Sequence, residues 1–128
     1  MLRNWPRFSA NELVCACCGV HRMHDGFMAR LEKLRDAMDM PLRLSSAYRC
    51  PRHNVFVSNT GPRGPHTTGH AVDILIAGAD ALRLVQHAIA CGMTGIGISQ
   101  KGAHASRFVH VDDLPDGAGH PRPWLWTY

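Results

Sequence analysis

Residues 66–77 read HTTGHAVDILIA, and this stretch decides both the fold and the first candidate site. Its second half is a run of aliphatic and β-branched residues, which is typical of a buried strand. Asp73 interrupts this run, and an unpaired carboxylate inside a buried strand carries a high desolvation cost. His66 precedes Asp73 by seven positions, in a loop. A metal ion bound by both side chains would remove that cost, so the stretch predicts a strand that carries a metal ligand.

A second alternating stretch, RFVHVD at 107–112, predicts a neighbouring strand. His110 and Asp112 then face one side of the sheet, opposite the two valines. Two imidazoles and a carboxylate would supply the three N and O ligands of a catalytic zinc, with a fourth position left for water. Taken singly, His110 is as well explained as a hydrogen-bonded polar residue, and Asp73 as a turn cap or the partner of an arginine. Only their combination favours a metal.

Two amphipathic helices are expected. The first begins near Asp25 and ends before Pro41, with its apolar residues at helical spacing: Phe27, Leu31, Leu34 and Met38. The second covers residues 79–91, with Leu82, Val85 and Ile89 on its apolar side, and Gly92 ends it. A short helical turn is also expected at 9–13, where Ser9 and Glu12 have the spacing of a capping box.

Further strands are expected at 42–46 and 95–99, whereas residues 58–65, SNTGPRGP, have the composition of a loop. The chain is expected to turn away at Pro51, and the tail from residue 113 onward is expected to be rich in loops. The resulting order is helix, strand, loop, strand, helix, strand, strand. It predicts one α+β domain over residues 1–128, with a small antiparallel sheet packed against helices on one face.

The composition excludes some classes of protein. The 128 residues are 45% hydrophobic and 19% charged, with a net charge of +4, which is ordinary for a globular domain. No apolar stretch approaches the length of a membrane helix, and no basic run interleaved with aromatics supports a nucleic-acid surface. The first residues lack the apolar core of a secretory signal, so cytoplasmic synthesis is expected, with a monomeric product.

Three motifs in order resemble the metallopeptidase family M15. HTTGHAVDI resembles its H-x-x-G-x-A-x-D signature, SSAYRCPRHN its S-x-Y-R-x-x-x-x-N segment, and GIGI followed by RFVHVD its closing element. The resemblance extends over nearly the whole chain. It implies the fold of DD-peptidases and hedgehog domains, and zinc-dependent hydrolysis of peptidoglycan or its peptides by a carboxypeptidase or endopeptidase. A lysis enzyme of a phage or prophage, or an enzyme exported to the cell wall, would both fit.

Carried over residue by residue, the resemblance implies one zinc ion on His66, Asp73 and His110. Arg49 matches the family arginine that binds the substrate carboxylate or the scissile carbonyl, and a guanidinium suits either role. Arg49 could instead pair with an acidic side chain such as Asp112. Tyr48, in the same segment, and Trp124, in the tail, are further candidates for contact with substrate.

The general base cannot be carried over. One branch of the family has Glu three positions before the last histidine ligand, where this chain has Arg107, and another has His two positions before it, where this chain has Phe108. The candidates are therefore Asp112, His104 and His70. Asp112 could equally be the hydrogen-bonding partner that orients a zinc-bound histidine.

The cysteines Cys15, Cys17 and Cys18 remain outside this scheme. They could bind a structural metal together with Cys50 or His21, although the C-x-C-C run lacks the spacing of ordinary zinc knuckles. The alternative is a set of small buried residues with one close pair, such as Cys17 or Cys18 near Cys50. Trp124 and Trp126 could stack on sugar rings or simply pack over the core.

Two other functions are consistent with parts of the sequence. A non-catalytic, zinc-stabilised binding module of the same fold would explain why no base stands at the usual positions. A nucleic-acid-binding protein with a cysteine and histidine zinc site would require strongly salt-dependent binding, and the scattered basic residues argue against it.

Overall fold

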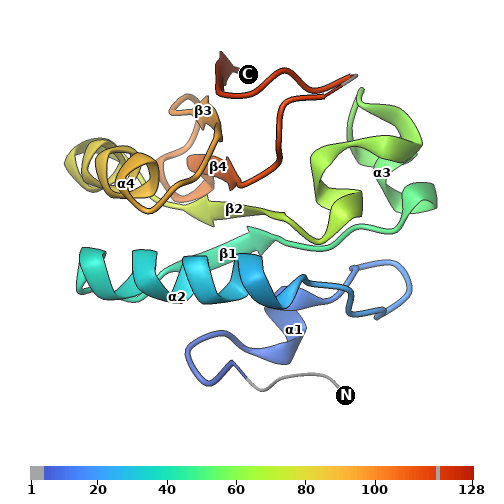
Figure 1. Ribbon diagram of the computed structural model, residues 1–128, viewed down its shortest axis with the longest axis horizontal. Helices are drawn as coiled ribbons and strands as arrows, with labels where there is room; N and C mark the ends of the chain where they lie inside the picture. Colours follow the sequence, from blue (N-terminus) through green and yellow to red (C-terminus); the bar gives the residue numbers. More distant parts are fainter. Residues whose placement is uncertain (1–4, 118) are drawn as a thin grey trace.

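The computed structural model describes residues 5–117 and 119–128. Five strands form one open sheet in the order β1-β2-β4-β3-β5. Their bounds are β1 Arg43–Ser46, β2 Ala71–Leu75, β3 Gly95–Ser99, β4 Phe108–Asp112 and β5 Trp124–Thr127. Neighbouring strands are antiparallel except β3 and β5, which are parallel. The fold is α+β, as expected, but the sheet is mixed because the tail adds a parallel edge strand (Figure 1).

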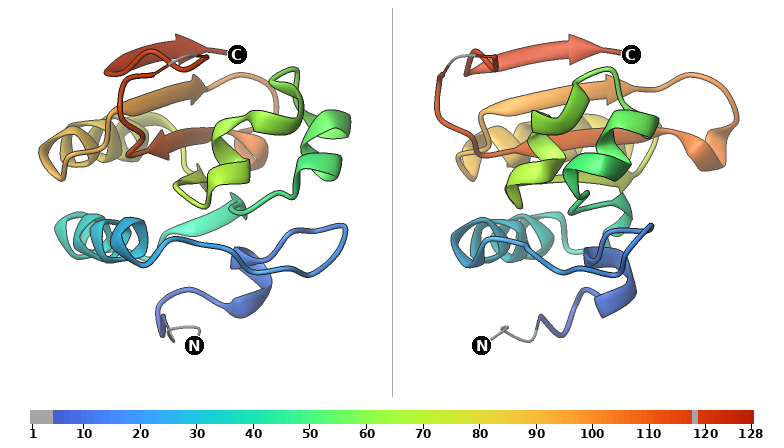
Figure 2. Two further views of the ribbon diagram at one scale, coloured as in Figure 1. Left: turned by 45° about the vertical axis from the view of Figure 1, so that its right-hand side comes forward. Right: turned by 90° about the vertical axis from the view of Figure 1, so that its right-hand side faces the viewer.

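The two long helices, α2 (Asp25–Met38) and α4 (Gly78–Ala90), lie side by side and form the core with one face of the sheet (Figure 2). The four apolar residues expected on α2 are all buried. The helix ends at Met38, and its C-cap Asp39 has a left-handed backbone, before Pro41 is reached. The capping box of the short helix α1 (Ala10–Leu13) is present as expected.

The buried face of α4 differs from the expected one. Leu82 and Ile89 are 64% and 60% exposed, whereas Ala81, Leu84 and Ala88 are buried. The two sets have the same helical spacing, and the hydrophobic pattern gave more weight to the one with the larger side chains. The prediction of a helix was confirmed, and Val85 packs against the core as expected, but the placement of Leu82 and Ile89 was wrong.

The segment expected to be turn and loop is partly helical. It contains α3 (Pro51–Val57) and two 3-10 turns, η1 (Gly61–Arg63) and η2 (Pro65–Thr68). Pro51 occupies the first position of α3, where a missing N–H costs nothing and the fixed φ favours a helix. A third 3-10 turn, η3 (His104–Ser106), precedes β4. Figure 1 shows α3 and its adjoining turns at the opposite end of the molecule from α4.

Alternation along the strands separates the two faces of the sheet. Val72, Ile74, Val109 and Val111 point into the core, so Asp73 and His110 lie on the other face. The strand register then places five residues in one row across the sheet: Ser46, Asp73, His110, Gly97 and Trp126. This row is the floor of the candidate site.

Candidate metal centre

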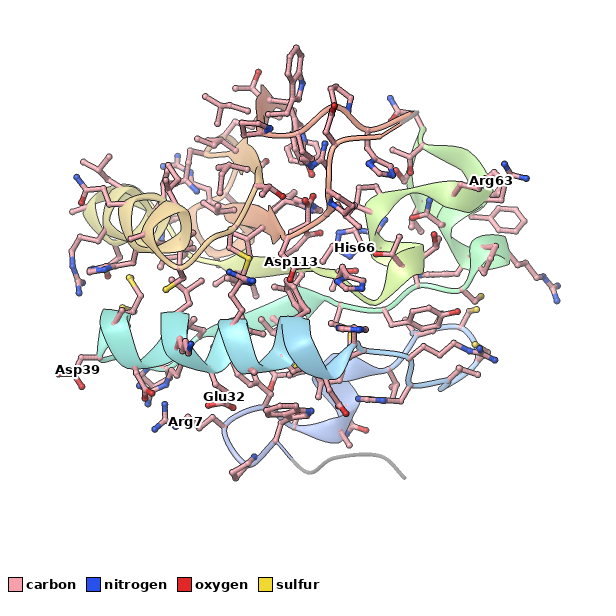
Figure 3. All side chains as sticks on the ribbon, in the orientation of Figure 1. Arg7, Glu32, Asp39, Arg63, His66 and Asp113 are labelled. Carbon is pink, nitrogen blue, oxygen red and sulfur yellow. The ribbon has the colours of Figure 1, made fainter. Side chains whose placement is uncertain are left out.

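Three side chains from separate elements meet above the row. His66 is held by η2, Asp73 by β2 and His110 by β4. Nε2 of His66 lies 3.1 Å from Oδ1 of Asp73 and 3.2 Å from Nδ1 of His110, and that Nδ1 lies 3.1 Å from the same Oδ1. The three atoms form a nearly equilateral triangle. Figure 3 places His66 in the interior of the molecule, between the sheet and the 3-10 turns.

In each imidazole, the hydrogen bond on the side away from the triangle fixes which nitrogen carries a proton. Nδ1 of His66 lies 2.7 Å from the carbonyl oxygen of Ala47, and Nε2 of His110 lies 2.7 Å from Oδ2 of Asp112. Both oxygens can only accept a hydrogen bond, so both of these nitrogens donate. In the neutral rings, the nitrogens that face the triangle therefore carry lone pairs. Two imidazole lone pairs and a carboxylate oxygen thus converge on one point.

This donor set fits a zinc ion. Ligands about 2.0–2.1 Å from a tetrahedral zinc lie about 3.4 Å from one another, close to the sides of the triangle. When both rings are neutral, three electron-rich atoms face each other in a buried site, and a cation between them would relieve their repulsion. Burial lowers the pKa of His66, which favours the neutral imidazole that binds a metal. Burial alone would lower the pKa of His110, but Asp112 and Asp73 raise it, so a metal that binds here displaces a proton from this ring.

Arg49 is tied to this centre through Asp73. Its Nη2 lies 3.3 Å from Oδ2 of Asp73, while Nε donates to Ser46 at 2.9 Å and Nη1 donates to Asn54 at 3.0 Å. The acidic partner of Arg49 is thus Asp73, not Asp112. The guanidinium holds the carboxylate so that its other oxygen faces the histidines.

Asp112 lies behind His110, on the side of the ring away from the triangle. Both of its oxygens also accept from Arg122, whose Nε lies 2.9 Å from Oδ1 and whose Nη2 lies 2.8 Å from Oδ2. Burial alone would raise the pKa of Asp112, but the hydrogen bonds from His110 and Arg122 outweigh it and lower this pKa to about 2. This geometry suits a carboxylate that orients a metal-bound histidine better than one that takes a proton from a water molecule in the centre.

Two glycines of β3 make room for these groups. A Cβ on Gly97 would lie 2.6 Å from the indole of Trp126, and a Cβ on Gly95 would lie 2.4 Å from the carboxylate of Asp112. The indole ring can therefore settle over the sheet, with its centroid 4.9 Å from that of His110 and 5.2 Å from the guanidinium carbon of Arg122. The sequence GIGIS is thus explained by the contacts of its glycines as well as by the burial of Ile96 and the partial burial of Ile98.

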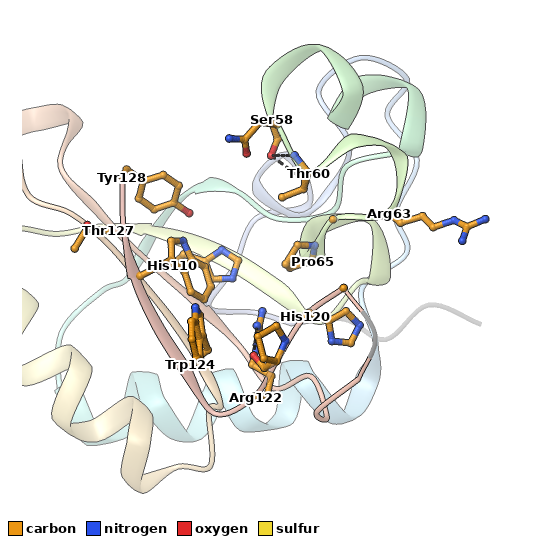
Figure 4. Close-up of a pocket in the computed structure, with 15 residues that line it drawn as sticks. Ser58, Thr60, Arg63, Pro65, His110, His120, Arg122, Trp124, Thr127 and Tyr128 are labelled. Carbon is orange, nitrogen blue, oxygen red and sulfur yellow. Dashed lines mark hydrogen bonds between the residues drawn. The ribbon is translucent and has the colours of Figure 1, made fainter.

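A cavity of about 640 Å³ opens beside His110 (Figure 4). One wall comes from the segment 58–65, with Ser58, Thr60 and Arg63, and the other from the tail, with His120, Arg122, Trp124, Trp126 and Tyr128. Such a volume is typical of sites for small ligands or short peptides. Trp124, expected to contact substrate, is 54% exposed and lines this cavity.

Three other expected site residues lie elsewhere. His104 is exposed on η3, and His70 stacks on His24 and lies 2.8 Å from Asp113 through Nδ1. Tyr48 is 5% exposed and belongs to the hydrophobic core. None of the three lines the cavity beside His110.

Among the residues that line the cavity, sequence reasoning did not single out His120, Arg122 or Tyr128. Nδ1 of His120 is buried and has no hydrogen-bond partner among residues 5–117 and 119–128. Burial, and after it the negative charge of Asp73, raises the pKa of the Tyr128 hydroxyl, which therefore stays protonated. The alternating WLWT was the available signal that the tail returns to the sheet, but the prolines around it favoured a loop.

Within the part of the chain that the structure describes, no helix has the length and hydropathy needed to cross a membrane. Searches of curated proteins and of solved structures found no match. The sequence model of one family, Peptidase M15, matches residues 6–112. That match covers most of the chain and includes the whole triangle of ligands together with Arg49 and Asp112. The chain belongs to the peptidase M15 family, whose members are zinc-dependent peptidases.

Proposed function

We propose that this chain is a zinc peptidase that hydrolyses a peptide bond in the stem peptides or cross-links of bacterial peptidoglycan. The observation that carries the proposal is the convergence of two imidazole lone pairs and one carboxylate oxygen beside a cavity of about 640 Å³. A structural zinc site normally has four protein ligands, whereas a catalytic one has three and an open position. The set of His66, Asp73 and His110 is of the second kind.

A zinc ion held here supplies Lewis-acid activation of water and of an amide carbonyl. The protein contributes a fixed geometry. The carbonyl of Ala47 and the carboxylate of Asp112 hold the two imidazoles, and Arg49 holds Asp73. Because every ligand has a partner behind it, little reorganisation is needed when substrate arrives.

Two residues on the cavity wall are proposed to act on substrate. The Tyr128 hydroxyl points into the cavity near His110 (Figure 4), and a protonated phenol there can donate to a developing oxyanion. His120 lines the same cavity, so its imidazole is the candidate for proton transfer to or from the reacting groups. We assign Asp112 the positioning role for His110.

The proposed substrate class fits the surroundings of the centre. The cavity combines aromatic rings with the charged or polar side chains of Arg63, Ser58 and Thr60, which suits a peptide that carries carboxylates. The exposed indole of Trp124 offers a face on which a sugar ring can stack. The net charge of +4 would also draw the protein towards an anionic cell wall.

The test is to incubate zinc-loaded protein with purified peptidoglycan and to identify the released fragments by mass spectrometry. His66→Ala removes one ligand, and His104→Ala serves as a matched control because His104 is exposed outside the cavity. We expect new peptide termini with the wild type and the control, and none with His66→Ala. The termini identify the bond that is cut. Intact wall with one zinc bound at the triangle would instead favour the non-catalytic binding module.

A further inference from the structure

A second group of potential ligands lies outside the proposed active site. The Sγ atoms of Cys15, Cys17, Cys18 and Cys50 all lie within 4.8 Å of one another. Cys17 is 3.5 Å from Cys15 and 3.4 Å from Cys50, measured between sulfurs. In a tetrahedral zinc site with bonds of about 2.3 Å, the sulfurs lie about 3.8 Å apart. The four thiols are therefore gathered at nearly the separation that one tetrahedral ion requires.

The backbone around these thiols forms a tight turn. The N–H of Cys15 donates to the carbonyl of Val20 at 2.9 Å, and the N–H of Gly19 donates to the carbonyl of Cys15 at 2.8 Å. Gly19 has a φ of 69°, a conformation that glycine adopts without strain. Cys15 and Cys18 are separated by two residues and followed by this glycine, which is a spacing common in structural zinc sites. The intervening Cys17 hid that spacing when the run was interpreted as C-x-C-C.

Backbone donors point at two of the sulfurs. The N–H of Cys50 lies 3.3 Å from Sγ of Cys15, and the N–H of His53 lies 3.4 Å from Sγ of Cys50. Hydrogen bonds of this kind stabilise thiolates and hold them in place around a metal. His21, the other expected ligand, is not part of the group, which consists of cysteines only among the described residues.

We propose that Cys15, Cys17, Cys18 and Cys50 bind a second zinc ion in a closed, structural site. Four thiolates leave no open position for water, and soft sulfur ligands in a tetrahedron favour zinc over magnesium or calcium. Binding would release the protons of the thiols that are not already ionised. This site is independent of the peptidase proposal, because it shares no ligand with the triangle.

The second ion would hold two segments of the chain together. It would join the N-terminal loop, which passes close to α3 in Figures 1 and 2, to the residue that follows Arg49. Arg49 in turn holds Asp73, and its N–H donates to the carbonyl of His66 at 3.0 Å. The cysteine site would thus fix the segment that positions two ligands of the first centre.

The test is the zinc content and sulfur coordination of protein purified and kept under a reductant. We expect two zinc ions per chain in the wild type and in the control Cys91→Ser, whose thiol lies outside the group. His66→Ala should retain one ion, and X-ray absorption of that variant should show four sulfur neighbours at about 2.3 Å. Because this variant keeps all the cysteines, the test does not depend on whether cysteine variants fold.

Cys17→Ser provides the complementary variant, since Cys17 is exposed and its loss should remove one ion while leaving the other. The proposal is overturned if His66→Ala binds no zinc, or if the zinc in that variant has N and O neighbours instead of sulfur. A disulfide that persists under the reductant and occupies Cys17 would also overturn it. Peptidoglycan hydrolysis is a separate readout: His66→Ala should lose hydrolysis and keep the sulfur-bound ion, so that failure of one proposal leaves the other intact.

Discussion

At the scale of single residues, the hydrogen bond between Asp112 and His110 fixes which nitrogen of His110 faces the triangle. Asp112→Asn keeps the shape of the side chain but loses the charge and can present an N–H to His110. We expect the affinity for zinc at the triangle to fall about 10–100-fold, the range found for such outer partners. Titration against a competing chelator measures it, with the exposed Asp80→Asn as a control. An unchanged affinity would show that Asp112 does not orient the ligand.

Two single side chains of the cavity wall, Tyr128 and His120, can be tested separately. Tyr128→Phe removes one donor and should lower kcat by about 10²–10³-fold, the cost of losing an oxyanion donor. His120→Gln should lower kcat by about 10²-fold or more and remove one limb of the pH–rate profile. Steady-state kinetics on a purified stem peptide provides both values, and the zinc content should stay at the wild-type level. A wild-type kcat in either variant would exclude that residue from the reaction.

At the scale of helices and strands, β3 has a glycine at position 97 because the indole of Trp126 packs directly on it. Gly97→Ala would place a methyl group 2.6 Å from the indole of Trp126, so that ring has to move away from His110. We expect a loss of about 1–3 kcal/mol in the free energy of unfolding, as for other overpacked sites. The cost should shrink in a Trp126→Ala background, because the clash is then absent. Equal costs in both backgrounds, measured by denaturant unfolding, would contradict the assigned contact.

Helix α4 offers a test of its buried face with two leucines. Leu84 is fully buried and Leu82 is 64% exposed. We expect Leu84→Ala to cost about 2–5 kcal/mol of unfolding free energy and Leu82→Ala at most about 0.5 kcal/mol. The reverse order would restore the face that the sequence pattern predicted.

A comparison of the expected and observed helices and strands shows which of them the sequence could predict. The strand that carries Asp73 follows from its run of β-branched residues. The strand that carries His110 follows from its alternation, and α2 from its helical spacing, because burial on one face imposes those periods. The identity of α4's buried face did not follow, because Ala81, Leu84 and Ala88 have the same helical spacing as Leu82, Val85 and Ile89. Only the contacts of α4 with α2 and the sheet decide between the two sets. Helix α3 and strand β5 were hidden by prolines, although Pro51 stands where a helix accepts it.

Some residues of the candidate site could be predicted from the sequence and others could not. His66, Asp73 and His110 were predicted from residue types and order, and the family match covers all three. His120, Arg122 and Tyr128 were not found, because they reach the cavity only through the pairing of β5 with β3. β5 in the tail pairs with β3, a strand distant in sequence, and no pattern within the tail itself predicts this pairing. For the cysteine group, the sequence left open whether Cys50 or His21 joins the other three, and the fold brings Cys50 to them.

At the scale of the whole molecule, the triangle connects elements that are distant along the chain. It ties η2, β2 and β4 together, so bound zinc should stabilise the entire domain and not one loop. The catalytic claim depends on this centre more than on any other feature.

The most direct measurement is therefore the rate at which labelled peptidoglycan is solubilised by protein stripped with a chelator and then returned to zinc. We predict that stripping abolishes the rate, that zinc restores it in the wild type, and that Asp73→Ala stays inactive at every zinc concentration. A rate that survives chelation, or one that zinc restores in Asp73→Ala, would contradict the assignment of His66, Asp73 and His110 as the catalytic zinc site.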